Sequence, residues 1–588
     1  MHIKPAHLIL FFMLVTAMFH IIIPLSIGQT ILSRDPDTYY TIRQVEVMVN
    51  NFPQYNWFDP MTAYPVGKAT DWGPLFALIA SSICILFGAH TFLQIYSISS
   101  LISPIISILI IPIIYLLGKE ILDKNTGLAA AGLATVISLQ YFISSSYTGW
   151  ADHHIMEVFF TTLFFLTYLY SLNKSVWQIP LSITSGFMFF LSLITSTTTL
   201  ISLVVIIGYI IVISFFREHT IIPTTISMIT SIFLLVAFGF VRDPGLSLIQ
   251  YSTGVVYIQI AVVIVSIITF IFVEIIKCHP RAIWLIPIGI LSICISAIQF
   301  LQPVRDIWNQ SINLLFGASR YTDVVSETTR WSSSGMWNSF NFSIILFICG
   351  IIILIYYRNN KTIFLLVWTL WMVFLTLLHQ RFQYYLTIPL VLVSGICISE
   401  CLKWDKKNYF KLIILLIAGG CIAMSVYNDI NYVVNNKDRL SPEWVNTMEW
   451  IRENTLNPGI DYYGDYSGFI YPEQAYGVVS LWDYGHWITT LGHRISVANP
   501  FQQGVVETSN YFLSKNLTEA NDILKKMNGK YVIIDSNMLS LMGSMSPWIG
   551  EKERGDYNDT MAYRLYYSTV PNYTLVHQEG DIKVFSKD

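Results

Sequence analysis

Ionisable residues interrupt this strongly apolar chain at a few places. Asp152, His153 and His154 stand together in the run YTGWADHHIMEVFF, at the edge of a segment apolar enough to span a membrane. Asp37 is the second acid of DPDTYY, and the polar C-terminal part carries LWDYG at residues 481–485. Ionisable groups beside membrane spans usually have a function, because placing charge there costs free energy. Together these residues indicate a membrane-embedded, metal-assisted enzyme.

The side chains of Asp37, Asp152 and His154 offer two carboxylates and one imidazole to a single divalent cation. This mixed oxygen and nitrogen set suits Mn²⁺ or Mg²⁺ and tolerates Zn²⁺. We expect His153 to point away, since neighbouring residues at a helix start do not share a face. The alternative interpretation is that DPD forms an Asx-turn and DHH caps the helix that begins near Ile155.

The distribution of apolar residues predicts the membrane domain that must position these groups. Of the 588 residues, 54% are hydrophobic and 12% are charged, about half the charged share of an ordinary soluble domain. Apolar runs of spanning length recur from residue 7 to about 426, after which the sequence becomes polar, aromatic and turn-rich. Thirteen spans are predicted, at 7–29, 93–118, 126–145, 155–171, 178–194, 197–216, 220–241, 255–277, 282–301, 343–357, 362–379, 383–401 and 410–426.

Basic residues predict the orientation of these spans, because short cytoplasmic loops are enriched in Lys and Arg. One face holds Lys4, Lys119, Lys124, Lys174, Arg217, Lys277, Arg281, Arg358, Lys361, Lys403, Lys406, Lys407 and Lys411. The short loops of the other face hold only Arg242 and Arg381. We therefore expect a cytoplasmic N-terminus and an extracytoplasmic C-terminal domain in a multi-pass protein of the cell membrane.

The fold class expected is a polytopic α-helical membrane protein with a C-terminal mixed α/β extracytoplasmic domain. The transmembrane catalytic domain is expected at 1–426 and the soluble domain, which carries WDYG, at 427–588. The outer loops 30–92, 146–154 and 302–342 then share one compartment with the soluble domain. The apolar stretch 73–88 is short for a span, so an interfacial helix is expected there. The long loop 302–342 is expected to act as a lid.

Two further charged residues fall on the outer face. Arg381, in LLHQRFQYYLTIPL, is a fixed cation at the outer membrane edge, where a guanidinium can bind a lipid-linked phosphate through two hydrogen bonds. The alternative is an arginine that snorkels toward lipid headgroups. Glu327, in TDVVSETTRW, lies in the long outer loop, where a solvated acid is the ordinary expectation.

Cysteine usage and charge exclude other classes of protein. All seven cysteines lie in or beside the apolar region and none forms a CxxC pair, so the sequence predicts neither a disulfide framework in the C-terminal domain nor a cysteine zinc site. The C-terminal domain is mildly acidic and has no basic run interleaved with aromatic residues, and nucleic-acid binding is therefore not expected.

The chain resembles the catalytic subunit of oligosaccharyltransferase, most closely the archaeal single-subunit type called AglB. The resemblance spans the full length and rests on DPDTYYTIR, GWADHHIMEVFF, VVSE, QRFQYYL and YGVVSLWDYGHWITTLGHR followed by ANPFQ. It implies a GT-C-type glycosyltransferase that moves a glycan en bloc from a dolichyl or other polyprenyl phosphate or diphosphate to the side chain of Asn in Asn-X-Ser/Thr. The implied partners are the lipid-linked oligosaccharide donor, acceptor proteins with that sequon and membrane lipids, and the enzyme is expected to act as a single subunit.

The resemblance also implies roles for the ionisable residues. Asp37 and Glu327 would accept hydrogen bonds from the acceptor amide, offsetting part of its lost resonance, since a full twist of an amide costs roughly 18–20 kcal/mol. A metal held by Asp37, Asp152 and His154 would neutralise charge on the departing phosphate. Arg381 would bind the same phosphate.

Recognition of the acceptor hydroxyl is implied for Trp482 and Asp483 of the WDYG element. A buried polar pair built for a hydroxyl rejects residues that lack one, which explains a sequon requirement. This sequence has Leu481 where the family usually has a first tryptophan, so one indole N–H is missing.

A second element, IIDSNMLSLM, resembles the family's DxxKxxxM pattern near the hydroxyl pocket. Asp535 and Met542 keep their positions, whereas Met538 stands in place of the lysine. The alternative interpretation is a strand that leads into a core helix.

Three other kinds of protein are weighed against this resemblance. Another polyprenyl-phosphate-dependent membrane glycosyltransferase, acting on lipid or hydroxyl acceptors, would lack the hydroxyl-reading WDYG. A transporter would show repeat symmetry and paired charges near the bilayer midplane. A membrane-anchored binding or surface-layer protein would leave the acids of three separate loops without a purpose.

Overall fold

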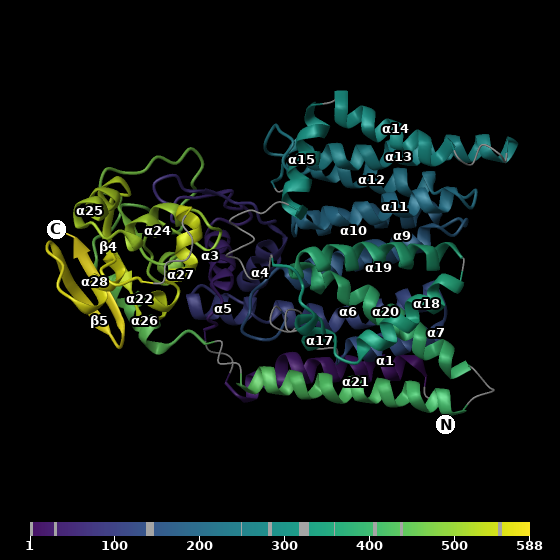
Figure 1. Ribbon diagram of the computed structural model, residues 1–588, viewed down its shortest axis with the longest axis horizontal. Helices are drawn as coiled ribbons and strands as arrows, with labels where there is room; N and C mark the ends of the chain where they lie inside the picture. The colour runs from purple at the N-terminus through teal and green to yellow at the C-terminus, as the bar shows by residue number, and fades with distance from the viewer. Residues whose placement is uncertain are drawn as a thin grey trace.

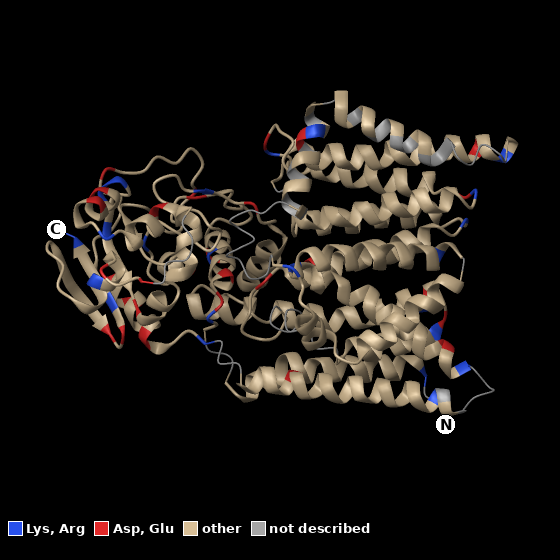
Figure 2. Ribbon diagram, viewed as in Figure 1, with Lys and Arg blue, Asp and Glu red and all other residues tan. Residues whose placement is uncertain are grey.

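The computed structural model of the chain describes residues 4–28, 32–136, 146–248, 250–279, 285–300, 302–316, 329–357, 359–403, 408–435, 439–550 and 556–587. A bundle of long helices forms one end of the molecule and a mixed α/β domain forms the other (Figure 1). The N-terminus lies at the end of the bundle remote from the C-terminal domain (Figure 1). Lys and Arg of the bundle gather mostly at that same remote end (Figure 2).

The helices of the bundle include the described parts of the apolar runs predicted as spans, and the number of thirteen crossings stays a prediction. They are α1 (Pro5–Ala17), a π-helical turn (Met18–Ile22), α2 (Ile23–Ser26), α5 (Phe92–Ser99), α6 (Ile102–Ile121), α7 (Lys124–Ala134), α9 (His154–Ser171), α10 (Gln178–Leu193), η2 (Thr197–Leu200), α11 (Ile201–Ser214), α12 (Ile221–Ala237), α13 (Thr253–Cys278), α14 (Leu285–Phe300), α15 (Gln302–Phe316), α17 (Ser333–Phe340), α18 (Ser343–Tyr356), α19 (Asn360–Leu378), η5 (Gln380–Phe382), α20 (Gln383–Lys403) and α21 (Asn408–Asn435). Helices are expected, because a helix satisfies all its backbone groups internally in lipid.

Length and apolar composition distinguish the helices that can cross a membrane from the shorter ones. Among the described residues, seven helical stretches are long and apolar enough to cross a membrane, or eight if α17 and α18, bent by 93°, count as one span. The helices α10 and α12, and α4 (Leu75–Leu86) at the predicted interfacial segment, are apolar but shorter. The long outer loop 302–342 includes two helices, α15 and α17, and α21 extends past the predicted end of the last span.

Small residues allow close backbone approach between helices that frame the site. A Cβ atom at Gly118 of α6 would lie 2.6 Å from the Cα atom of Gly127 on α7, and one at Gly395 of α20 would lie 2.8 Å from the backbone nitrogen of Ala130. In a membrane, such packing replaces the hydrophobic effect as the force that holds helices together. The close packing of α6 against α7, and of α7 against α20, therefore fixes the position of α20 in the bundle.

The outer segment between the first two spans contains α3 (Pro36–Asn50), two short antiparallel strands and α4. The strands, β1 (Phe58–Asp59) and β2 (Lys68–Ala69), have two residues each. The guanidinium of Arg43 on α3 donates from Nε to Oδ2 of Asp59 at 2.7 Å and from Nη2 to Oδ1 at 2.9 Å, and both side chains are fully buried. The Arg43 guanidinium also lies 4.4 Å from the ring centre of Tyr462 in the C-terminal domain. The bidentate pair fixes the guanidinium, and the contacts of Arg43 with Tyr462 join the outer segment to that domain.

The C-terminal domain is mixed α/β, as predicted. Its four-stranded sheet has the order β3-β4-β6-β5, with β3 and β4 parallel and the other pairs antiparallel. Its elements are α22 (Pro442–Asn454), β3 (Gly477–Val479), η6 (Trp482–Tyr484), α23 (Gly485–Thr490), α24 (Val505–Leu513), α25 (Leu517–Lys526), β4 (Gly529–Ile534), α26 (Ser536–Ser540), α27 (Met542–Met545), η7 (Ser546–Ile549), α28 (Met561–Tyr567), β5 (Tyr573–Glu579) and β6 (Ile582–Lys587). The WDYG element thus connects β3 to α23, which packs against α3.

Candidate active site

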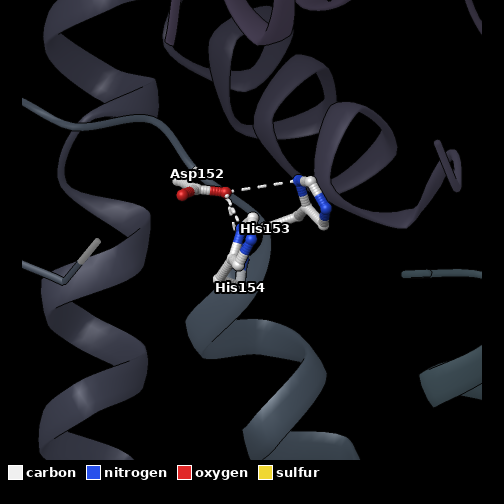
Figure 3. Close-up of side chains that lie close together, drawn as sticks. All are labelled: Asp152, His153 and His154. Carbon is white, nitrogen blue, oxygen red and sulfur yellow. Dashed lines mark hydrogen bonds and ion pairs between the residues drawn. The ribbon is translucent and has the colours of Figure 1, made fainter. Parts of the chain in front are cut away.

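Asp152, His153 and His154 form a compact cluster at the start of α9. The Oδ1 atom of Asp152 lies 2.6 Å from Nδ1 of His154 and 3.3 Å from Nδ1 of His153 (Figure 3). One ligand atom from each of the three residues lies within 4.8 Å of the others, and this is the one such group of three among the described residues. The cluster therefore presents a carboxylate and two imidazoles to one point.

The expectation that His153 points away is wrong. His153 precedes the first residue of α9, and its ring centre lies 4.7 Å from that of His154. Asp152 lies before the helix rather than on its surface, so the alternation of helix faces does not separate the two rings. Both imidazoles reach back to the same carboxylate (Figure 3).

Behind the cluster, His153 is held by a buried acid that the sequence analysis did not single out. Its Nε2 atom lies 3.1 Å from Oε1 of Glu157, one turn along α9. The other oxygen of Glu157 accepts hydrogen bonds from the hydroxyls of Tyr385 at 2.7 Å and Tyr384 at 3.2 Å. An acid four residues after His153 within an apolar helix is a signal that the sequence does contain. Such partners orient the ring of a metal-site histidine.

The two acids of DPD, Asp35 and Asp37, have different structural roles. Asp35 caps α3, because its Oδ2 accepts hydrogen bonds from the backbone N–H of Thr38 at 2.8 Å and from the hydroxyl of Thr38 at 2.7 Å. The Asx-cap interpretation is thus correct for Asp35, and it leaves the side chain of Asp37 43% exposed. Burial, together with the nearby charge of Asp152, raises the pKa of Asp35 above its usual range.

The structure brings the DPD loop and the DHH loop together. The hydroxyl of Thr38 accepts a hydrogen bond from the backbone N–H of Ala151 at 3.3 Å. The hydroxyl of Tyr96 accepts from the backbone N–H of Ser33 at 2.7 Å and donates to the carbonyl of Gly149 at 2.6 Å. Asp37 itself does not belong to the compact group formed by Asp152 and the two histidines.

His486, which follows WDYG directly, is a second residue that the sequence analysis did not single out. It is fully buried, its Nδ1 lies 3.1 Å from the backbone carbonyl of Pro36, and the same nitrogen lies 3.8 Å from Oδ1 of Asp37. Burial lowers the pKa of His486 to about 3. The imidazole is therefore neutral, and since a carbonyl only accepts, Nδ1 carries the proton and donates it to Pro36. The ring also stacks on Tyr40, with 4.9 Å between ring centres.

The acceptor-recognition residues of the sequence analysis lie beside this contact. Trp482 is buried, and burial raises the pKa of Asp483 to about 6, although the charge of Arg34 and a hydrogen bond with Trp482 lower it in part. Leu481, in the place of the family's first tryptophan, is 1% exposed and belongs to the hydrophobic core.

Asp535 contacts the WDYG element, and Met542 lies in the hydrophobic core. Asp535 caps α26 by accepting from the backbone N–H of Met538 at 2.8 Å, and the same oxygen accepts from the hydroxyl of Tyr484 at 2.7 Å. Met538 and Met542 are buried in the core. The strand-to-helix connection of the alternative interpretation is present, and Asp535 links it to WDYG.

Arg381 lies in η5, the short turn between α19 and α20, with intermediate exposure. The ring of Tyr384, three residues further along, packs edge-on against that of His154 with 5.1 Å between ring centres, which places this turn beside the cluster. The backbone N–H of Gln380 donates to the carbonyl of Thr329 at 3.0 Å, so the chain just after Glu327 is fixed beside Arg381. Glu327 itself lies outside the described residues.

Two family models match this chain. "Oligosaccharyl transferase STT3, N-terminal" matches residues 26–306, and "AglB core domain" matches residues 441–539, which include the WDYG element. The chain belongs to the STT3/AglB oligosaccharyltransferase family. Membership in this family argues against the transporter and the surface-layer protein.

Relatives of this STT3/AglB protein cover nearly all of it. Dolichyl-phosphooligosaccharide-protein glycotransferase 3 of Archaeoglobus fulgidus is 25% identical over 94% of this chain and 71% of its own length. The structure of A. fulgidus AglB in complex with an inhibitory peptide and a dolichol-phosphate has a TM-score of 0.86 at 20% identity, covering 98% of this chain and 79% of that chain. An A. fulgidus oligosaccharyltransferase complex with Zn and sulfate has a TM-score of 0.78 at 22% identity, covering 99% and 73%. The shared fold is a GT-C-type, multi-span membrane protein with a C-terminal globular domain.

Proposed function

We propose that this STT3/AglB protein transfers a glycan en bloc from a dolichyl or other polyprenyl phosphate or diphosphate to the Asn side chain of Asn-X-Ser/Thr sequons. The observation that carries the proposal is the hydrogen bond from His486 to Pro36, which places WDYG directly against the DPD loop. The DPD loop in turn contacts the DHH loop through Thr38 and Ala151. An acceptor bound at WDYG would therefore have its Asn near the ionisable cluster.

The acceptor amide needs activation, because its nitrogen lone pair is delocalised into the carbonyl. Asp37 and Glu327 are the proposed hydrogen-bond acceptors for its two N–H groups. Both must be ionised, since a protonated acid does not accept in the same way. The distance of 3.8 Å between Oδ1 of Asp37 and Nδ1 of His486 supports this role, because it places the acid beside the WDYG element.

The donor set of Asp152 and His154 fits a divalent cation, because their ligand atoms already converge. We assign Asp37, Asp152 and His154 as the protein ligands and Mn²⁺ or Mg²⁺ as the native ion. When bound, the ion supplies Lewis-acid stabilisation of the charge that develops on the departing phosphate. Arg381 binds that same phosphate, and the ring contact between Tyr384 and His154, which holds this turn beside the cluster, supports the role.

Trp482 and Asp483 are proposed to bind the hydroxyl of the acceptor Ser or Thr. Asp535 supports them through the hydroxyl of Tyr484, and Met542 is buried in the hydrophobic core. Because Leu481 provides no indole N–H, the carboxylate of Asp483 contributes more to the discrimination between acceptors with and without the hydroxyl.

The domain organisation proposed is a transmembrane catalytic domain at 1–426 and an extracytoplasmic domain at 427–588, with a cytoplasmic N-terminus. The opposite placement of the N-terminus and the C-terminal domain supports their location on opposite sides (Figure 1), and the Lys and Arg at the N-terminal end of the bundle support a cytoplasmic location of that end (Figure 2). The chain is proposed to act as a single subunit, which is tested by transfer with the purified chain alone.

The deciding experiment is glycopeptide formation by the purified protein. The assay combines a lipid-linked oligosaccharide extract, Mn²⁺ with or without chelator, and matched peptides that carry Asn-X-Thr or Asn-X-Ala. Metal-dependent product from the Thr peptide alone is expected. Transfer to lipid or to a hydroxyl group instead, with an authenticated donor, would identify another polyprenyl-phosphate glycosyltransferase and overturn the proposal.

A further inference from the structure

A cavity of about 580 Å³ opens at the seam between the membrane domain and the C-terminal domain. Three separate segments line it: residues 54–58 of the outer segment, Arg242 of the loop between α12 and α13, and residues 465–469 of the C-terminal domain. Its volume falls within the roughly 300–1,000 Å³ that is typical of small-molecule sites. Nothing in the catalytic proposal uses this cavity.

The wall of the cavity is aromatic and held in place. Trp57, Phe58 and Phe469 are each half-buried along it. The ring of Trp57 packs edge-on against Tyr55, with 4.9 Å between ring centres, and against Tyr251, with 5.5 Å. A rigid aromatic surface presents flat apolar faces at little cost in conformational entropy.

The rest of the lining is polar. Gln54, Asp465 and Ser467 are exposed at the cavity, and the guanidinium of Arg242 lies 4.7 Å from the ring centre of Trp57. These side chains offer amide, carboxylate, hydroxyl and guanidinium groups, which include both hydrogen-bond donors and acceptors. Aromatic faces combined with such groups match a sugar, which has C–H faces and a rim of hydroxyls.

The cavity is also connected to the catalytic cluster. The hydroxyl of Tyr55 donates to the carbonyl of Trp72 at 3.2 Å, and the ring centre of Trp72 lies 4.7 Å from that of His153. On the other side, Nη2 of the buried Arg43 donates to the hydroxyl of Tyr466 at 3.2 Å, which fixes the 465–469 loop. The lining is thus preorganised and lies one aromatic layer from the site.

We propose that this seam cavity binds sugar residues of the donor glycan beyond the one attached to the phosphate. The inference rests on the proposed function and adds to it a binding site for the outer sugar residues of the glycan. The contacts of Trp72 with His153 and with Tyr55 connect the cluster to this seam, where the outer sugars of a glycan anchored at the cluster would bind. A second cavity, of about 730 Å³, is lined only by the C-terminal domain, between residues 456 and 587, and therefore lacks any contact with the loops that hold the cluster.

The test compares two donors with the full-length purified enzyme. One is the lipid-linked oligosaccharide extracted from the source cells, and the other is the same lipid trimmed by exoglycosidases to a single sugar. Two variants remove the site in opposite ways: Trp57→Ala deletes the aromatic face, and Ser467→Trp fills the space. Lys525→Ala, at the second cavity, is the matched control.

Both variants are expected to raise the KM for the full-length donor about five- to tenfold and to leave transfer from the single-sugar donor unchanged. Lys525→Ala is expected to change neither value. Equal losses with both donors, or no change with the long donor in the folded Ser467→Trp variant, would overturn the cavity assignment. A wild-type enzyme that uses neither donor would instead overturn the proposed function.

Discussion

His486 of the C-terminal domain donates a hydrogen bond from Nδ1 to the backbone carbonyl of Pro36, over 3.1 Å. Pro36 lies between the helix cap Asp35 and the proposed catalytic Asp37, and the neutral imidazole is fully buried. The element that is proposed to read the acceptor hydroxyl thus fixes the backbone that carries the acid. Binding of the acceptor and placement of the catalytic carboxylate depend on the same contact.

Replacement of His486 tests this positioning role. His486→Phe keeps an aromatic ring in the stack but removes the donor, and it is expected to lower kcat at least tenfold with a smaller change in peptide KM, because small misplacements at a reacting centre are costly. His486→Asn, which restores an N–H near the position of Nδ1, is expected to recover part of the loss. Steady-state kinetics with the Asn-X-Thr peptide provide the measurement, and equal activity of the two variants would contradict the role.

The raised pKa of Asp483 predicts a pH dependence of acceptor binding. Because burial raises that pKa to about 6, the carboxylate is ionised above pH 6 and becomes protonated below it. The KM for the Asn-X-Thr peptide should therefore rise as the pH falls through 6. An acid whose folded pKa is raised favours folding when it is protonated, so this titration should not unfold the protein.

Circular dichroism at each pH provides the control for that experiment. Asp483→Asn should bind the peptide more weakly, and its KM should no longer rise as the pH falls through 6. If the KM of Asp483→Asn still rises near pH 6, another titratable group causes the pH dependence.

The cluster at α9 predicts different effects for its two histidines. His154→Ala is expected to abolish metal-dependent transfer, since it removes a proposed ligand. His153→Ala is expected to raise the Mn²⁺ concentration needed for half-maximal activity about 10- to 100-fold, the usual range for a residue that orients metal ligands. Titration of Mn²⁺ after removal of metal with a chelator measures both. An unchanged Mn²⁺ requirement in His153→Ala would limit His153 to packing against Trp72 and Glu157.

The buried pair of Arg43 and Asp59 predicts a large loss of stability when it is broken. Arg43→Met leaves an unpaired buried carboxylate, and it is expected to lower the free energy of unfolding by about 3–5 kcal/mol. The double variant Arg43→Met/Asp59→Leu removes both charges and should be less destabilised than the single variant. Thermal unfolding in detergent compares the two, and a double variant that is the less stable would contradict the assignment.

The sequence by itself determined the elements of this protein. Lipid leaves a spanning segment little choice but a helix, so the apolar runs predicted the bundle helices, and the change of composition near residue 426 predicted a separate mixed α/β domain. The types of the ionisable residues also predicted their chemistry, because carboxylate and imidazole groups bind the same ions in any fold.

Only the tertiary structure decided how those side chains are arranged. It placed both imidazoles on Asp152, gave the cap of α3 to Asp35, and brought His486 to Pro36 across 450 positions of the chain. These contacts join residues from different elements or depend on the exact start of a helix. Local periodicity encodes which residues share a face of one element, and it contains no information about which faces meet.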